Sequence, residues 1–207
     1  FNQFFAGVEA ERDRRYGLGV DQRFGEYLFA GAEVSKRKID LPIAIQTPPP
    51  EPGFSVVTTR VDESNARAYL YWIPSPNTSV SLNYQYDLAE YDDNFAPYGF
   101  RTLETHRFPF NASYYAANGF SFGLTPTFVH QRGKFQDFNP PFDLSRDDDD
   151  FWVVDGYVQY RLPNRWGVVR LEGGNLFDSS FKFQDVDPEN PRILPERLIL
   201  LKLTVAM

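Results

Sequence analysis

The sequence predicts an all-β protein: an antiparallel transmembrane β-barrel of the bacterial outer membrane, with about ten strands in this chain. Apolar and polar residues alternate with a period of two along most of the chain. Aromatic residues make up 17% of it, and short turns alternate with long polar loops. Alternation places successive side chains on opposite faces of a strand, and membrane barrels carry aromatic girdles at both membrane interfaces.

Composition narrows the class further. No stretch approaches the roughly 18 to 20 apolar residues that a membrane-spanning helix needs. The chain has no Cys, which excludes a disulfide framework and a thiolate metal site. Its net charge of −7 argues against a nucleic-acid partner. The chain begins at Phe1 without an initiator Met, so we expect a processed form or a fragment.

Residues 79–88 show the alternation most clearly. Val80, Leu82 and Tyr84 point to one face of a strand, and Ser81 and Asn83 point to the other. A helix would scatter the same apolar residues around its circumference. These residues therefore predict a strand with one apolar and one polar face.

The same pattern recurs in nine further segments, most of them near the length that a tilted strand needs to cross a bilayer. The expected strands are residues 4–11, 16–21, 28–35, 65–72, 79–88, 107–114, 120–128, 152–162, 169–173 and 199–207. We treat residues 1–207 as one barrel domain, or as the C-terminal part of a larger barrel.

The two faces have different expected surroundings. The apolar face should contact lipid: Val80, Leu82, Tyr84, Phe122, Leu124, Val154, Val158, Leu201 and Leu203. The polar face should line the lumen: Arg67, Asp87, Asp155, Gln159, Arg161, Arg170, Glu172 and Lys202. Charges in such an interior need partners or water, so we expect cross-strand ion pairs, with Glu172 and Lys202 as the best candidate pair.

The connections predict the topology. Short turns are expected at residues 25–26, 74–77, 117–119 and 163–165, and long loops near 40–53, 91–99, 136–150 and 184–191. A short hairpin is expected at Asp13-Arg14-Arg15. Short turns on one rim and long loops on the other are typical of outer-membrane barrels, on the periplasmic and extracellular sides respectively. Both termini would then be periplasmic.

A soluble β-sandwich or lipocalin-like barrel would also alternate. Alternation alone does not say which face is inside. The asymmetry of the loops and the aromatic residues at the strand ends favour the membrane barrel.

The segment Gly174-Asn175-Leu176-Phe177-Asp178, about 30 residues before the end, resembles the "NLFD" motif of TonB-dependent receptors. In that family the motif closes the penultimate barrel strand, and the stretch from Pro195 into residues 198–207 resembles the last strand. Asn and Asp suit a strand exit because they tolerate the left-handed conformation and cap turns. The resemblance implies a pore or receptor domain for passage of a solute across the outer membrane.

This chain departs from the family pattern in three ways. It ends in Met207 rather than in an aromatic residue, and it contains neither a plug domain nor a TonB box. The ending is also similar to barrels fused behind periplasmic tetratricopeptide repeats, some of which serve in export. The expected partners are outer-membrane lipid, the barrel assembly machinery, and a plug or repeat domain upstream; we expect no cofactor.

A rim-site enzyme is the third alternative, because ten-stranded outer-membrane proteases exist. Such an enzyme needs a His and several Asp residues together at the extracellular rim. His106 and His130 are the only histidines, and both fall on the apolar face, so we expect no catalytic site. The run Asp147, Asp148, Asp149 and Asp150 could hold a divalent cation through oxygen ligands, although a solvated loop is the favoured interpretation.

Overall fold

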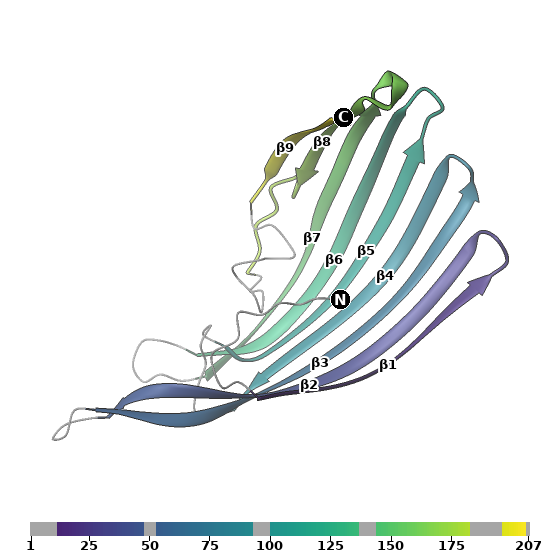
Figure 1. Cartoon of the computed structure of the whole chain (residues 1–207). Coiled ribbons are helices and arrows are strands. Elements are labelled where there is room, and N and C mark those ends of the chain that lie inside the picture. The colour runs from purple at the N-terminus through teal and green to yellow at the C-terminus, as the bar shows by residue number, and fades with distance from the viewer. Residues whose placement is uncertain (1–11, 48–52, 93–99, 137–143, 183–195, 206–207) are drawn as a thin grey trace.

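The computed structural model describes residues 12–47, 53–92, 100–136, 144–182 and 196–205. Within them, nine strands form a single sheet in chain order, each antiparallel to its neighbours (Figure 1). The elements are β1 (Arg12–Phe24), β2 (Leu28–Thr47), β3 (Gly53–Ser75), β4 (Thr78–Tyr91), β5 (Phe100–Tyr115), β6 (Phe120–Gln136), β7 (Leu144–Arg161), the 3-10 turn η1 (Pro163–Arg165), β8 (Gly167–Gly174) and β9 (Leu198–Val205).

The sheet curves into an arc with β1 at one edge and β9 at the other (Figure 1). In the part of the chain that the structure describes, β1 is hydrogen-bonded only to β2, and β9 only to β8. The sheet is therefore open there, with one unpaired backbone edge on each outer strand.

The turns predicted from Pro, Asn and Gly lie together at one end of the sheet. The connections after β3, β5 and β7 all fall at this end, which we call the short-turn end (Figure 1). Asp147 pairs with Gly133 at the opposite end of β6 and β7, which we call the long-loop end. The predicted antiparallel order and the shared rim of these turns are confirmed.

Several strands are longer than predicted, and this corrects three expectations. Asp13-Arg14-Arg15 is not a hairpin but part of β1, where the Arg37 guanidinium Nε lies 2.7 Å from Asp13 Oδ2. Residues 40–47 continue β2 rather than forming a loop, because β-branched residues there pair with others in β3. Asp147–Asp150 lie inside β7, not in a loop.

Other expectations lie outside the described residues. These are the first expected strand at 4–11, the end of the last strand at 206–207, and the expected loops at 93–99 and 184–191. Residues 4–10, whose pairing with β9 would give a closed barrel, are among them.

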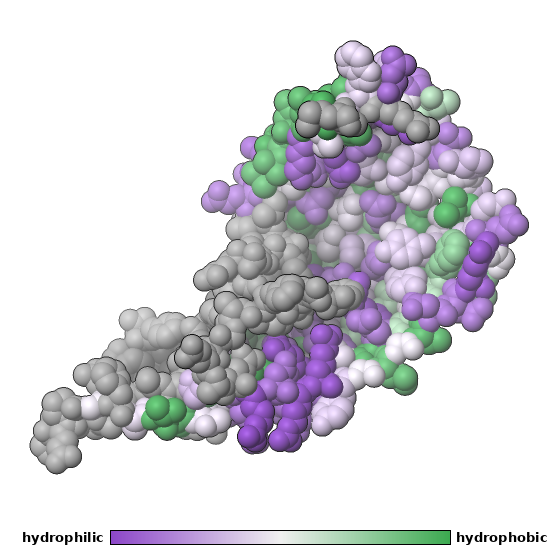
Figure 2. Space-filling view, viewed as in Figure 1, coloured by the Kyte–Doolittle hydropathy of each residue, from purple (hydrophilic) through white to green (hydrophobic). Residues whose placement is uncertain are grey.

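On the central strands, apolar side chains are exposed on one face of the sheet and small polar side chains are buried on the other. On β6, Phe122 is 55% exposed while its neighbour Ser121 is 5% exposed; on β4, Leu82 is 51% exposed and Ser81 is 7% exposed. We call the face of Leu82 and Phe122 the outer face, and the face of Ser81 and Ser121 the inner face. Figure 2 shows hydrophilic residues gathered over the hollowed side of the sheet.

Among the described residues, the clusters of buried apolar side chains on the inner face lie at the long-loop end. One cluster consists of Val129, Phe151 and Val153 with Phe181 against it. A second consists of Ala89, Phe100 and Leu103 with Tyr91 and Phe135 against it. The inner face is therefore polar toward the short turns and partly apolar toward the long loops.

Two glycines on the inner face make room for tyrosine rings from the next strand. Gly31 is paired with Tyr69 and Gly123 with Tyr157, and each ring lies where a glycine Cβ would be. Tyr157 in turn donates a hydrogen bond to Ser113 Oγ at 3.3 Å, and the Arg170 guanidinium lies 4.0 Å from the centre of its ring. The missing side chain at Gly123 thus positions a ring that organises its neighbours.

We predict that Gly123→Val destabilises the fold by about 1–3 kcal/mol, because the new side chain must displace the Tyr157 ring. In a Tyr157→Ala background the same substitution should cost less, since the Ser113 hydroxyl, which can rotate, is then the nearest remaining side-chain atom. Denaturant titration of the four proteins in detergent micelles measures this coupling. Equal costs of Gly123→Val in both backgrounds would contradict it.

Candidate functional site on the inner face

All eight residues predicted to line a lumen share the inner face. The pairing runs from Arg67 through Gln85 to Arg107, and from Gln159 through Arg170 to Lys202, so each set points the same way. Residues directly opposite one another in an antiparallel pair share a face. The remaining members follow from the two-residue period: Asp87, Asp155, Arg161 and Glu172.

Ion pairs bridge neighbouring strands on this face. Lys202 Nζ contacts Glu172 Oε1, as predicted, and Arg170 Nε lies 3.4 Å from Glu172 Oε2. Arg107 likewise contacts Asp87. Each pair leaves the carboxylate next to a cation in a position where water is partly excluded, and this lowers the cost of burying it.

The structure adds charged residues that the predicted set left out. Arg37 is buried and pairs with Asp13 and with Glu63, whose Oε2 is 3.5 Å from Arg37 Nη1. Arg107 is also buried. The alternation around Phe108 already places Arg107 on this face, whereas Arg37 could be found only by extending the third expected strand beyond residue 35.

Not every predicted member is part of an ion pair. Asp155 Oδ1 accepts a hydrogen bond from the backbone N–H of Asn175 at 2.8 Å. Gln159 Oε1 is 3.5 Å from Arg170 Nη1. Within the described residues, the Arg161 guanidinium has no hydrogen bond or ion pair, so it is a free cation on this face.

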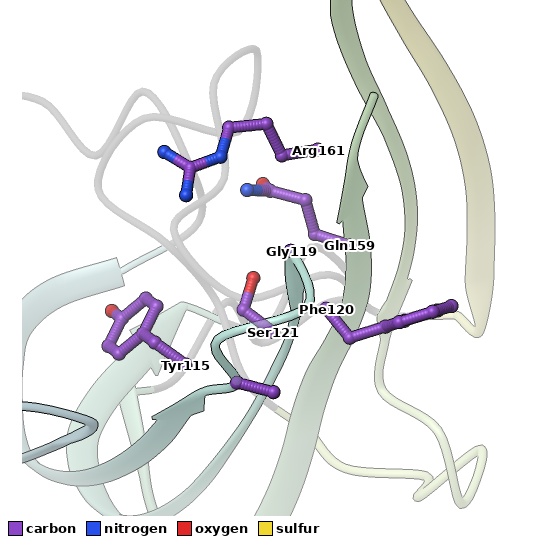
Figure 3. A pocket seen from close by; sticks show the side chains of 7 residues that line it. Tyr115, Gly119, Phe120, Ser121, Gln159 and Arg161 are labelled. Atoms are coloured by element: carbon purple, nitrogen blue, oxygen red, sulfur yellow. The ribbon is translucent and has the colours of Figure 1, made fainter. Parts of the chain in front are cut away.

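A hollow of about 140 Å³ lies beside Arg161 at the short-turn end, between β5, β6 and β7 (Figure 3). Arg161, Gln159 and Ser121 extend toward a shared space with Tyr115 across from them, whereas the Phe120 ring points away. The hollow therefore joins a free cation to an amide and two hydroxyl groups.

The Asn175 segment forms a tightly bonded turn at the end of β8. Asn175 is fully buried and has a left-handed backbone with φ of 46°. Its side-chain amide donates to Ser179 O at 3.1 Å and accepts from Ser179 N at 2.9 Å. Asp178, also left-handed with φ of 55°, accepts a hydrogen bond from Arg197 N at 3.1 Å, just before β9. The predicted turn chemistry of Asn and Asp is confirmed.

The chain after this turn lies against the inner side of β7. The Phe181 ring stacks on Phe151, with 4.3 Å between centroids and 5° between planes. Lys182 N donates to Asp149 Oδ2 at 2.6 Å, and Lys182 Nζ donates to Asp147 Oδ1 at 3.0 Å. The turn and these contacts hold the segment 175–182 along the part of β7 from Asp155 to Asp147.

These contacts explain the acidic run, which was predicted to be a loop or a cation site. In a strand the four carboxylates alternate between faces, so Asp147 and Asp149 meet Lys182 while Asp150 meets His130. Among the described residues, no group of three or more acidic, His or Cys side chains is arranged to hold a metal ion.

The two histidines lie opposite each other on the outer face, with 5.8 Å between ring centroids. His106 Nε2 is 3.0 Å from Glu104 Oε1, and His130 Nδ1 is 2.5 Å from Asp150 Oδ1. Arg132 Nε donates to Glu104 Oε2 at 2.8 Å. These groups form a polar belt across β5, β6 and β7, on the long-loop side of the outer-face aromatics.

Comparison with protein family models, with curated proteins and with solved structures finds no match to this chain. Within the described residues, the structure has no helix that is long and apolar enough to span a membrane.

We predict that Asn175→Ala lowers the free energy of unfolding by about 1–3 kcal/mol, because it removes two side-chain hydrogen bonds and places Ala at a positive φ. Asn175→Gly keeps the backbone freedom and loses only the hydrogen bonds, so it should fall between Ala and Asn. Denaturant midpoints in micelles measure the series. Three equal midpoints would show that this turn does not contribute to stability.

The contact between Asp147 and Lys182 should be visible in a titration. Hydrogen bonding from Lys182 lowers the pKa of Asp147 below its usual 3.8, and Asp147 raises the pKa of Lys182 above 10.5. Both side chains are therefore charged at pH values between the two pKa values, and the ion pair is then present. It is lost as pH falls through the lowered pKa of Asp147 or rises through the raised pKa of Lys182.

By NMR titration, Lys182→Gln should return the Asp147 pKa toward 3.8. Lys134→Gln, at the same end but on the other face, should leave the Asp147 pKa unchanged. A shift of equal size in both variants would mean that general charge, not this contact, sets the pKa.

Proposed function

We propose that this chain is part of a transmembrane β-barrel of the bacterial outer membrane and that its inner face lines a route for a solute. One observation carries the proposal. Large apolar side chains are exposed on the outer face of every described strand, while polar side chains lie on the inner face. Water-soluble proteins rarely expose a continuous apolar surface of this kind. Lipid would remove it from water.

The extent of the outer apolar band supports this. On β6 it runs from Phe120 to Phe128, and on β7 from Trp152 to Tyr160, about nine residues each. At roughly 3.4 Å per residue and a tilt of about 40°, this corresponds to a height of roughly 20 Å, close to the apolar band of known barrels.

Aromatic pairs border the band at both ends, as membrane interfaces favour. Phe128 and Trp152 have ring centroids 5.3 Å apart at the long-loop border, and Phe120 and Tyr160 have centroids 4.5 Å apart at the other. Beyond the long-loop border the outer face carries the polar belt around His106 and His130, which suits a headgroup region.

The side chains of the inner face suit passage of a solute rather than catalysis. Its hydroxyl, amide and paired charged groups can be hydrated, and we infer no enzymatic step. Nine strands closed on themselves would enclose only a narrow interior. Within the described ranges the edges of β1 and β9 are open, and this favours closure by further strands, as in a larger barrel that resembles TonB-dependent receptors in its Asn175 turn.

The absence of native Cys permits a direct test with single-cysteine variants of the protein in lipid vesicles or cells. Asn83→Cys and Thr125→Cys, on the inner face, should react with a charged, water-soluble maleimide. Leu82→Cys and Leu124→Cys, their neighbours on the outer face, should react only after denaturation. The reverse pattern would identify a soluble barrel with an apolar core and overturn the membrane proposal.

The same variants test transport. Labelling Asn83→Cys with a bulky maleimide should reduce conductance or solute entry through the barrel, whereas treating Leu82→Cys should have no effect. Labelling of Asn83→Cys without any change in passage would leave a membrane barrel that is not a conduit.

A further inference from the structure

We propose that the hollow beside Arg161 is a binding site for an anionic group, a carboxylate or a phosphate, carried by the solute. This inference rests on the proposed function for the origin of the ligand. The hollow itself is a feature of the inner face, whatever passes along it.

Arg161 has a free guanidinium within the described part of the chain. The other arginines at the centre of the inner face are engaged: Arg107 with Asp87 and Arg170 with Glu172. Arg161 has no partner among the described residues, and its guanidinium extends into the shared space of the hollow (Figure 3). A guanidinium offers five donors in a planar fork that matches a carboxylate or a phosphate.

The polar side chains around Arg161 also suit an anion. The Gln159 side chain lies beside that of Arg161 (Figure 3). The Ser121 hydroxyl points toward the same space, and Tyr115 lies on its opposite side. An amide N–H and two hydroxyls can each donate to an anion that Arg161 holds. None of the described residues that line the hollow carries a carboxylate, so no acidic side chain among them repels such a ligand.

The charged side chains near the hollow are mostly positive. Arg170 lies across the strand pair from Gln159, and Lys202 lies across from Arg170, while Glu172 is the acidic residue among them. Arg161, Arg170 and Lys202 are three cations, and Glu172 is one carboxylate. This part of the inner face is therefore basic, although the net charge of the whole chain is −7. Clefts lined by one sign of charge concentrate counter-ions of the other.

Size and position are consistent with this ligand. A hollow of about 140 Å³ holds several waters, or one carboxylate or phosphate group. The hollow opens on the inner face, on the other side of the sheet from the apolar band, so we assign the anion to a solute rather than to a lipid headgroup. Its place near the short turns puts it at the proposed periplasmic mouth.

The test is calorimetric titration of the refolded full chain in neutral-detergent micelles with inorganic phosphate and, separately, with acetate. Wild type should bind at least one of them, and Arg161→Gln should weaken binding about tenfold or more, as expected for loss of a charged hydrogen bond. Arg161→Lys should restore part of the affinity. Arg23→Gln removes a positive charge from the same rim on β1, outside the hollow, and should bind as wild type does.

Unchanged affinity in Arg161→Gln, an equal loss in Arg23→Gln, or no binding of either anion by wild type would overturn the site. Titration with vesicles of an anionic phospholipid separates the sources: binding that depends on Arg161 only with lipid would assign the anion to a headgroup and contradict our assignment.

Planar-bilayer recordings separate this inference from the proposed function. Conductance with no role for Arg161 in anion binding would leave transport standing and remove the site. Anion binding that depends on Arg161, without conductance, would leave the site standing and remove transport.

Discussion

Regular antiparallel pairing of each strand with the next is the constraint on which the rest of this structure depends. It satisfies the backbone hydrogen-bonding groups between strands, and it ties the orientation of every side chain to that of its cross-strand neighbour. A slip of one residue between two strands would turn a whole row of side chains to the other face. Between the described strands the register shifts only near the end of β3 and the start of β5, so along most of the sheet one face collects the apolar residues and the other collects the polar ones.

The polar face is organised by short-range charge pairing and by small residues. Arg37, Arg107 and Glu172 each contact an opposite charge on a neighbouring strand, so charge is neutralised locally along the face. Gly31 and Gly123 let tyrosine rings lie flat across the sheet, which fills space without adding charge. Among the described inner-face arginines of β5 to β8, Arg161 is the exception to this pairing, and its isolation is what makes the hollow beside it chemically distinctive.

At the long-loop end, the inner face carries apolar clusters as well as charged residues. There the inner face carries Phe100, Val129 and Phe151, and the segment after β8 packs on it through Phe181. Asp147 and Asp149 hold the end of that segment through Lys182. The same acidic run thus connects distant parts of the chain, because β7 carries alternate carboxylates to each face. The inner face of the sheet therefore combines a polar half and a half with apolar clusters.

By itself, the sequence determined the strand class, the antiparallel order, the short-turn rim and which residues share each face. These properties depend on a period of two and on turn residues such as Asn175, which are local signals. It also predicted the pairing of Glu172 with Lys202, since alternation puts both on one face of adjacent strands. The ends of the strands were predicted poorly: Asp13, Asp40 and Asp147 look like turn or loop residues, yet each lies in a strand. Only the tertiary structure decided this, because an acidic side chain remains in a strand when a cation on another segment is close enough to pair with it. The free guanidinium of Arg161 was likewise invisible in the sequence, since the lack of a partner depends on where every other charge lies in space.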